Sequence, residues 1–374
     1  MRSPGLYIHV PFCGSKCPYC DFYSISPAYG VTAWLGALKK EVHLYRDRFG
    51  PFESLYLGGG TPSVLGLDDL GALMDCLFEN FEFAPNTEIT IEANPGDVTV
   101  DFIAAVEAIG FNRVSLGVQS FDDRELAFLG RRHSAAEAAA ALERLSASGI
   151  GKVGIDLIYG LGDGLDGQSL DGWMRTLERT LRYDPEHISC YQLTIAGGTP
   201  FGQMKEEGRI TSLSEERGRA FFLATARLLG ERGYLHYEIS NFSHGEDNRS
   251  RHNSKYWDHS PYLGLGPSAH SFQGSRRWWN IRSVAAYVEA LEEGRAQLGG
   301  EETLTEEQLR LEALSLGLRT SRGVALSEVP EHPELSDVLS SLQASGHVRI
   351  EGGRILPTTE GFLVADRLPL SLLP

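Results

Sequence analysis

Three cysteines, Cys13, Cys17 and Cys20, form a Cys-x3-Cys-x2-Cys motif near the start of the chain. The other two, Cys76 and Cys190, lie far along the sequence in segments patterned like regular elements. Three thiolates in one tight loop can hold three corners of a four-iron cubane, which leaves the fourth iron open to a substrate. A closed structural metal site fills all four positions instead. The motif therefore predicts a reactive iron–sulfur cluster.

Zinc and disulfides are the alternative uses of these thiols. A structural zinc site would need a fourth cysteine or histidine at matching spacing, whereas His9 precedes the loop and would point along a strand. An odd number of cysteines, 5 in 374 residues, does not describe a secreted disulfide framework. Spacing alone favours the cluster and leaves zinc open. The cluster would also require a reducing compartment.

Composition and charge describe an ordinary globular protein. Hydrophobic residues make up 42% of the chain and charged residues 22%, and 374 residues can bury a large core. The net charge of −16, with no basic stripe to offset it, argues against a nucleic-acid-binding surface. No apolar run approaches the roughly 20 residues of a membrane span. Residues 1–5 lead directly into a strand, so we expect no signal peptide and a cytoplasmic protein.

Strand-like and helix-like segments alternate over the first two-thirds of the chain. Six apolar runs have the length and composition of buried strands, and segments with helical spacing separate them. Such repeats predict an α/β fold in which helices wrap a parallel sheet, either doubly wound or a partial barrel. The expected strands are 6–12, 54–57, 88–93, 113–118, 152–158 and 187–195, and the expected helices are 32–45, 67–78, 100–109, 135–148, 170–181 and 214–229.

The pattern changes after residue 235. Residues 241–282 are polar and aromatic, and we interpret them as an ordered excursion rather than another strand–helix unit. Two helices and a hairpin near the end predict a small, mainly helical, winged-helix-like C-terminal domain. That domain has few clustered basic residues, so we interpret it as a lid or docking module. The expected C-terminal elements are helices 306–318 and 335–345 and strands 348–351 and 354–357, within domains at 1–235, 236–300 and 301–374.

Polar residues end or follow the expected strands, where a parallel α/β sheet places its active site. A glycine run such as 58–60 is usually only a tight turn, but this one would adjoin the cysteine loop. A carboxylate inside an apolar strand, such as Glu92, is costly to bury unless a ligand or another partner compensates it. Each group taken singly has an equally good structural explanation, yet several on one rim predict a binding site. The candidates are Gly59, Gly60, Thr61, Glu92, Gln119, Ser120, Arg131, Asp156 and Gln192.

The cysteine motif, the glycine run and the six strand–helix units together resemble the radical S-adenosylmethionine (SAM) superfamily. The stretches 7–13, 117–121 and 156–161 narrow the resemblance to the oxygen-independent coproporphyrinogen oxidase group, and it covers essentially the whole chain. It implies a partial (β/α)6 barrel, an incomplete form of the TIM barrel. It also implies that the three cysteines bind a [4Fe-4S] cluster whose open iron is chelated by SAM. In such proteins one electron from the cluster cleaves SAM to a 5′-deoxyadenosyl radical.

The same resemblance implies which residues contact SAM. Thr61 and the backbone before it would meet the amino acid end. Glu92 and Arg131 would oppose the ammonium and the carboxylate, and Asp156 would suit a ribose hydroxyl. The full set of implied SAM contacts is Tyr7, Gly59, Gly60, Thr61, Glu92, Gln119, Arg131 and Asp156.

Two features depart from the oxidases. They carry a further cysteine two positions after the third, where this chain has Phe22, and a longer segment before the first strand. In both features the chain resembles the HemW-type haem chaperones instead. It also resembles them in the His-Asn-x-x-Tyr-Trp motif at 252–257. The resemblance implies that His252 binds haem, with Tyr256 and Trp257 placed to cover a porphyrin face. The alternative is a loop histidine beside two aromatic core anchors, and His259 and His270 are weaker ligand candidates.

The function that this resemblance implies is that of a haem chaperone. Such a protein would bind haem, a [4Fe-4S] cluster and SAM, and would pass haem to respiratory membrane proteins. The alternative function is an oxygen-independent coproporphyrinogen III oxidase, which forms protoporphyrinogen IX by radical decarboxylation. The sequence leaves open whether the chain is an enzyme at all. The resemblance further implies a homodimer and transient contact with a membrane during delivery.

Overall fold

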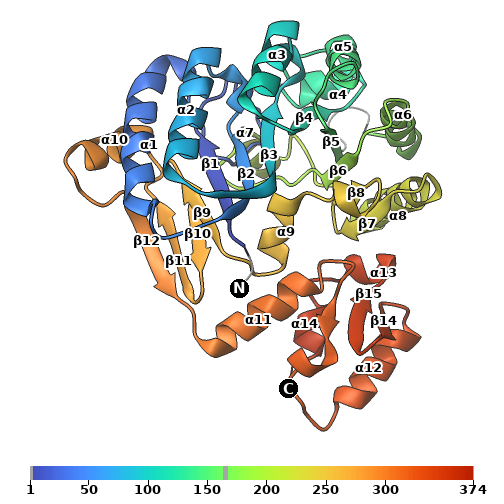
Figure 1. Cartoon of the computed structure of the whole chain (residues 1–374). Helices are drawn as coiled ribbons and strands as arrows, with labels where there is room; N and C mark the ends of the chain where they lie inside the picture. The colour runs from blue at the N-terminus through green and yellow to red at the C-terminus, as the bar shows by residue number, and fades with distance from the viewer. Residues whose placement is uncertain (1–2, 163–166, 374) are drawn as a thin grey trace.

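The computed structural model describes residues 3–162 and 167–373, and one mixed sheet organises most of them (Figure 1). Six parallel strands lie side by side in chain order and curve into a partial barrel, so the six expected strands are confirmed. The last of them is shorter than expected, because it ends at Gln192 rather than at residue 195. The strands are β1 (Gly5–Val10), β2 (Phe52–Gly59), β3 (Phe83–Ala93), β4 (Arg113–Gln119), β5 (Lys152–Tyr159) and β6 (His187–Gln192).

Six further strands extend this sheet at both edges. The order of the 12-stranded sheet places β9 parallel to β1, then β10, β11 and β12 antiparallel beyond it, and places β8 and β7 beside β6. The segment 241–282, interpreted from the sequence as an excursion, therefore contributes strands to both edges of the main sheet. The added strands are β7 (Leu235–Glu238), β8 (Asn241–Ser243), β9 (Tyr262–Leu265), β10 (His270–Gln273), β11 (Arg276–Asn280) and β12 (Leu298–Thr303).

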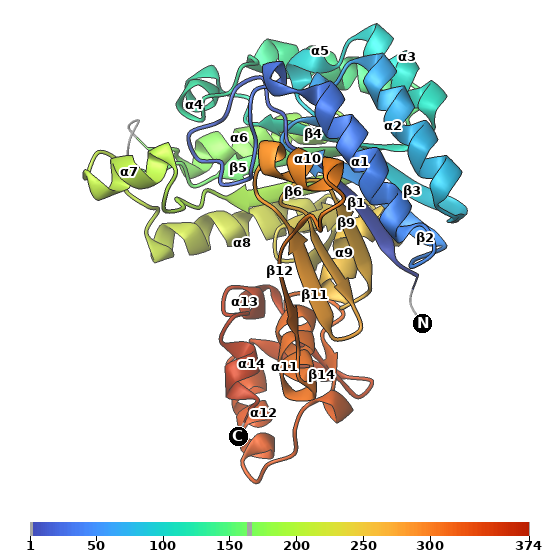
Figure 2. The ribbon, with the colours of Figure 1, turned by 90° about the vertical axis from the view of Figure 1, so that its left-hand side faces the viewer.

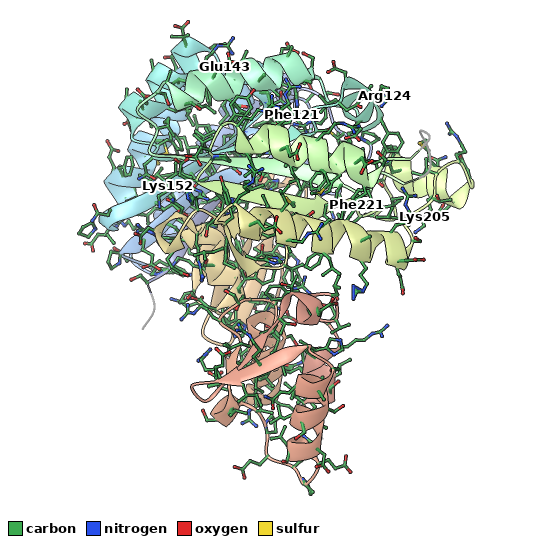
Figure 3. The ribbon with its side chains drawn as sticks, turned by 90° about the vertical axis from the view of Figure 1, so that its right-hand side faces the viewer. Phe121, Arg124, Glu143, Lys152, Lys205 and Phe221 are labelled. Carbon is green, nitrogen blue, oxygen red and sulfur yellow. The ribbon has the colours of Figure 1, made fainter. Side chains whose placement is uncertain are left out.

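Helices cover the convex face of the sheet (Figures 1 and 2). Figure 3 shows the same cover from the opposite side, with Phe221 of the longest helix against the strands. None of the described helices combines the length and apolarity needed to cross a bilayer. The helices are α1 (Val31–Tyr45), α2 (Leu67–Asn80), α3 (Val100–Ile109), α4 (Asp123–Phe128), α5 (Ala135–Ser146), α6 (Leu170–Leu181), α7 (Pro200–Glu206), α8 (Glu215–Glu231) and α10 (Val284–Glu292).

Strand β1 shows how the sequence divides the two faces of the sheet. Leu6, Ile8 and Val10 are fully buried in the same hydrophobic core as the helical residues, with 0% exposure each. Successive side chains in a strand point to opposite faces. Tyr7 and His9 therefore point into the barrel, where they line a cavity.

Glu41 on α1 fixes the turn between β9 and β10 to the helical layer. Its carboxylate is fully buried and accepts hydrogen bonds from the Gly266 amide (2.8 Å), Asn280 (2.6 Å), Tyr287 (2.5 Å) and Gln297 (3.1 Å). Burial raises the pKa of this carboxyl to about 7. The four donors compensate its removal from water, so the turn is held where the strand β10 begins.

The C-terminal part has its own small core and lies to one side of the barrel (Figure 1). The two expected helices and the hairpin are present, and a third strand that the sequence did not reveal joins the hairpin. The winged-helix likeness and the domain boundaries at 235 and 300 stay predictions. The elements are α11 (Glu306–Gly317), β13 (Val324–Ala325), α12 (Leu335–Ala344), β14 (Val348–Glu351), β15 (Arg354–Pro357), α13 (Thr359–Phe362) and α14 (Leu368–Ser371).

Candidate functional site

The cysteine loop leaves the end of β1 and is tied back to it at its base. The Cys13 amide donates to the Ile25 carbonyl (2.9 Å), and the Ile25 amide donates to the Pro11 carbonyl (2.8 Å). Within the loop, the Cys20 amide donates to the Cys17 carbonyl (3.1 Å). These backbone bonds make the loop a compact excursion at the carboxyl end of β1.

Two of the three thiols contact residues that the sequence had placed on the same rim. Cys13 Sγ lies 2.9 Å from Thr61 Oγ1, and Arg131 Nη1 lies 3.4 Å from Cys17 Sγ. Among the described residues, no three Cys, His, Asp or Glu side chains gather as they would around a single metal ion.

The loop covers a cavity of about 500 Å³ at the carboxyl ends of the strands, here called the cluster cavity. Cys20 lines it from the loop, and Gln192 lines it from β6. Seven of the eight residues expected to contact SAM also line it: Gly59, Gly60, Thr61, Glu92, Gln119, Arg131 and Asp156. Ser120 does not, because its hydroxyl donates to Glu125 (2.5 Å) in a buried position.

The glycine run packs against the cysteine loop rather than offering free amides. The amides of Gly59, Gly60 and Thr61 donate to Glu92 (3.1 Å), to the Val10 carbonyl (2.8 Å) and to the Phe12 carbonyl (2.7 Å). A Cβ at Gly60 would lie 2.4 Å from the Phe12 carbonyl oxygen, so only glycine fits. These three amides are therefore already paired within the protein.

Glu92 stands between the cluster cavity and the interior of the barrel. It accepts from the Tyr56 hydroxyl (2.8 Å) as well as from the Gly59 amide. Burial, reinforced by the nearby Asp156 carboxylate, raises the pKa of Glu92 to about 7. Tyr56 was missed from the sequence, although its alternation with the buried Leu55 and Leu57 marks a side chain on the inner face.

Asp156 and Arg131 complete the polar wall. Ser115 Oγ donates to Asp156 (2.9 Å), and burial raises the pKa of this carboxyl. Arg131 Nη2 donates to the Gly117 carbonyl (2.9 Å). Arg131 Nε and Gln119 Oε1 are buried without a hydrogen-bond partner among the described residues. Unpaired buried polar atoms beside a cavity fit a polar ligand that would satisfy them.

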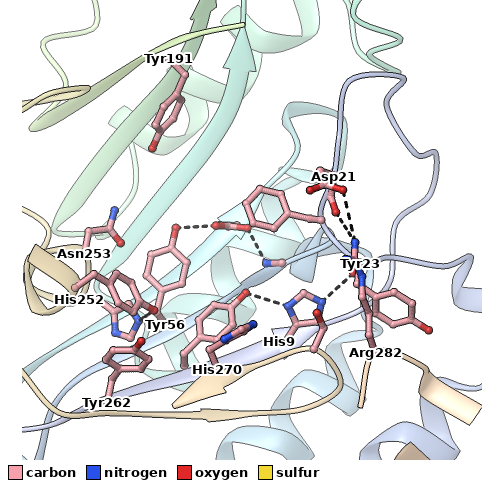
Figure 4. A pocket seen from close by; sticks show the side chains of 16 residues that line it. His9, Asp21, Tyr23, Tyr56, Tyr191, His252, Asn253, Tyr262, His270 and Arg282 are labelled. Atoms are coloured by element: carbon pink, nitrogen blue, oxygen red, sulfur yellow. Dashed lines mark hydrogen bonds and ion pairs between the residues drawn. The ribbon is translucent and has the colours of Figure 1, made fainter. Parts of the chain in front are cut away.

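A second cavity of about 480 Å³, here called the histidine cavity, adjoins the first (Figure 4). Tyr7 lines this cavity and not the cluster cavity, so it lies apart from the other expected SAM residues. His9, His252 and His270 line it as well. Both cavities share the residues Phe22, Tyr56, Gly59, Glu92, Tyr191 and Asn253 as a common wall.

The His-Asn-x-x-Tyr-Trp motif forms the short helix α9 (Arg251–Trp257), so His252 lies on a helix rather than in a loop. The His252 amide donates to Glu88 (3.1 Å), which sits on β3. Lys255 is buried, donates to the Ser3 carbonyl (2.7 Å) and forms an ion pair with Glu53. These contacts fix α9 against the amino ends of β1, β2 and β3.

The His252 imidazole is buried and fully engaged. Its ring is 1% exposed and stacks on Tyr56 with centroids 5.1 Å apart. Nδ1 is hydrogen-bonded to Ser54 Oγ (3.0 Å), and Nε2 to Tyr256 Oη (2.9 Å). Burial, together with the charge of Lys255, lowers the pKa of His252 to about 3. The ring is neutral, which suits a metal ligand, but both nitrogens already have partners.

The other motif residues and histidines take different positions. Tyr256 lines the histidine cavity, whereas Trp257 lies outside it under the Arg319 guanidinium, 5.5 Å from the ring centroid. His259 also lies outside, with Nε2 3.0 Å from Glu312. His270 lines the histidine cavity with an exposed side chain.

Comparison with known proteins assigns the chain to a family. Residues 7–178 match the model of the radical SAM superfamily. The chain is 35% identical to the heme chaperone HemW of Mycobacterium tuberculosis, covering 99% of this chain and 94% of that protein. It is 31% identical to HemW of Bacillus subtilis, covering 97% of each. The chain belongs to the HemW family of the radical SAM superfamily.

A solved structure supports the same fold. Coproporphyrinogen III oxidase HemN from Escherichia coli superposes with a TM-score of 0.83 at 23% identity, covering 99% of this chain and 90% of that one. The partial barrel expected from the sequence is thereby confirmed. Membership of the superfamily implies a [4Fe-4S] cluster and SAM, which favours the cluster over zinc at the cysteine motif.

The cysteine assignment can be tested by replacing one thiol inside the loop and one outside it. We expect Cys17→Ala to lose the cluster after anaerobic reconstitution. The motif supplies only three thiolates, and this change removes one of them. Iron and acid-labile sulfide content would measure this. Cys76→Ala, a buried cysteine on α2, is the control and should keep both. Four irons per chain in the Cys17 variant would contradict the assignment.

Proposed function

We propose that this chain is a haem chaperone that binds haem in the histidine cavity, beside a cluster and SAM in the cluster cavity. The observation that carries the proposal is the wall the two cavities share, which includes Phe22, Tyr56 and Glu92. The name of the family's curated members, heme chaperone HemW, supports haem as the cargo. A macrocycle in the histidine cavity would lie directly against whatever fills the cluster cavity.

SAM is the ligand we propose for the cluster cavity. Its ammonium would meet Glu92 and Thr61, its carboxylate would meet Arg131, and its ribose hydroxyls would meet Asp156. Gln119, with an unpaired buried oxygen, would take a further donor. Tyr7 would act from the neighbouring cavity. When bound, the cluster and SAM together supply radical chemistry, while the residues named here bind and orient the nucleotide.

Glu92 makes SAM binding depend on pH. The pKa of this carboxyl is raised to about 7, so it is mostly protonated at pH 6 and mostly ionised at pH 8. An ammonium prefers the ionised form, so we expect SAM affinity to fall roughly tenfold from pH 8 to pH 6. Calorimetry on the anaerobic, cluster-loaded protein would measure this.

Two variants serve to assign that pH dependence. Glu92→Gln should bind SAM weakly at both pH values. Glu41→Gln is the matched control, because the pKa of Glu41 is also raised to about 7 and Glu41 lines neither cavity. Equal affinity of the unaltered protein at pH 6 and pH 8 would remove Glu92 from the ammonium site.

A direct test separates the chaperone from the oxidase. We expect one haem to bind per reconstituted chain, followed through the Soret band. We also expect no protoporphyrinogen from coproporphyrinogen III, SAM and a reductant, relative to a cluster-free control. Product above that control would establish the oxidase instead. Failure of haem to saturate a site would contradict the chaperone proposal.

We also propose His252 as a ligand to the haem iron. Its present hydrogen bonds set one condition for this role. Nε2 must exchange the Tyr256 hydroxyl for iron, which costs about 0.5–1.5 kcal/mol of net hydrogen bonding. Tyr256→Phe removes that competitor, so we expect it to raise haem affinity about two- to tenfold. Tyr262→Phe, which deletes a hydroxyl elsewhere in the same cavity, should not. Weaker haem binding in the Tyr256 variant would contradict a role for His252 as ligand.

We further propose that the C-terminal part takes part in handing over haem. The family resemblance implies that respiratory proteins accept the haem. It also implies a homodimer, and transient membrane contact by an otherwise cytoplasmic protein. Arg219 of α8 donates to Glu360 of α13 (2.8 Å), and Arg319 covers Trp257. These contacts link the C-terminal part to the barrel close to α9. A docking role for that part is consistent with its position beside the haem motif.

A further inference from the structure

The three histidines of the histidine cavity differ in how their ring nitrogens are used. His9 Nε2 donates to the Tyr23 carbonyl (2.9 Å), so its Nδ1 accepts from the Tyr7 hydroxyl (3.1 Å). Both nitrogens of His252 are bound as well, to Ser54 and Tyr256. No residue in the described part of the chain hydrogen-bonds to the His270 ring. It is also the exposed one of the three.

His270 is held in orientation without losing its nitrogens. It is the first residue of β10, directly after the turn that Glu41 anchors through Gly266. Its ring stacks on the Trp279 indole of β11, with centroids 5.8 Å apart and planes 27° apart. A Cβ at Gly264 of β9 would lie 2.1 Å from the His270 carbonyl, so β9 and β10 are in close contact here. The imidazole is thus positioned by packing, while its lone pair stays free.

A third cavity, here called the aromatic cavity, lies on the other side of His270. It measures about 430 Å³ and is lined by Phe272 and Trp279, among others. Tyr256, Tyr262 and His270 line both this cavity and the histidine cavity. Ligand sites are concave, mostly apolar and of a few hundred cubic ångströms, with a few placed polar groups. Two adjoining aromatic hollows with a free imidazole between them fit a large flat macrocycle that carries a metal ion.

We propose that His270 supplies an axial ligand to the iron of haem bound at this junction. The inference rests on the proposed haem-binding function and names a ligand that this function requires. The bond is donation of an imidazole lone pair to iron, with no electron or proton transferred. His252 must first give up Tyr256, whereas His270 can coordinate as it stands.

The environment of His270 favours the ligating form. Partial desolvation of the ring, with a smaller effect from the Arg277 guanidinium, lowers the pKa of His270 below its ordinary value. The ring is therefore neutral at pH 7, as metal ligation requires. Its exposure also suits a cargo that has to be passed on, because an acceptor's ligand can reach iron held at the surface.

Haem titration of three chains, each loaded with its cluster, would test the proposal. We expect His270→Ala to bind haem at least tenfold more weakly than the unaltered chain and with a shifted Soret band. His43→Ala is the control, because that exposed histidine on α1 lines none of the three cavities. It should keep both the affinity and the spectrum.

A second measurement separates ligation from a structural role. Free imidazole should restore the original spectrum of haem-loaded His270→Ala, because it replaces the missing nitrogen. Retained iron and sulfide content would show that the variant is folded. If His270→Ala keeps the affinity and spectrum of the unaltered chain, the inference is overturned while haem binding stands. If the unaltered chain itself binds no haem, the proposed function fails first.

Discussion

Strand β1 positions the residues of the site, because neighbouring strands are hydrogen-bonded to it on both sides. Parallel β2 and β9 flank it, with Tyr7 level with Tyr56 on one side and with Gly264 on the other. Its outward side chains are buried under the helices, so its inward side chains cannot turn away from the barrel. The cysteine loop begins at the carboxyl end of this strand. One strand thereby fixes the loop and part of the wall of the histidine cavity.

Burial shifts the pKa values of several carboxyls and histidines inside the barrel toward their neutral forms. Desolvation raises the pKa of Glu92 and of Asp156, and it lowers the pKa of His9 to about 4 and of His252 to about 3. A cationic ligand reverses this for the carboxyls, because a positive charge close by favours their ionised form. Binding of a sulfonium and an ammonium in the cluster cavity would therefore release a proton from Glu92. The site is organised for a charge that arrives with the ligand.

Local patterns were enough to predict the parts of the site that are local. The cysteine loop was predicted from the spacing of its three thiols. The six parallel strands were predicted from their residue pattern, and the polar site at their carboxyl ends from the geometry of parallel sheets. The long-range pairing of β9 with β1 does not, because residues some 250 positions apart meet there. The family resemblance grouped Tyr7 with the SAM residues, although it lines the neighbouring cavity.

The state of a side chain was harder to predict than its position. The motif identified His252. The hydroxyl groups that hydrogen-bond to its two ring nitrogens come from β2 and from one turn further along α9. Lys255 reads as a solvated residue of a short helix, yet it is buried because Glu53 and the Ser3 carbonyl lie against it. His270 carries no motif that sets it apart from its neighbours. Only the three-dimensional contacts distinguish a free imidazole from a committed one.

Phe22 gives the shared wall its chemical character. Its side chain is 65% exposed and lines both cavities, so the residue at this position touches whatever occupies either one. A thiol there would offer a radical a hydrogen atom to abstract, and would offer a metal ion a ligand. A phenyl ring offers neither, and it adds apolar surface against which a porphyrin face can pack. In the proposed haem site, Phe22 would therefore supply packing surface and no reactive group.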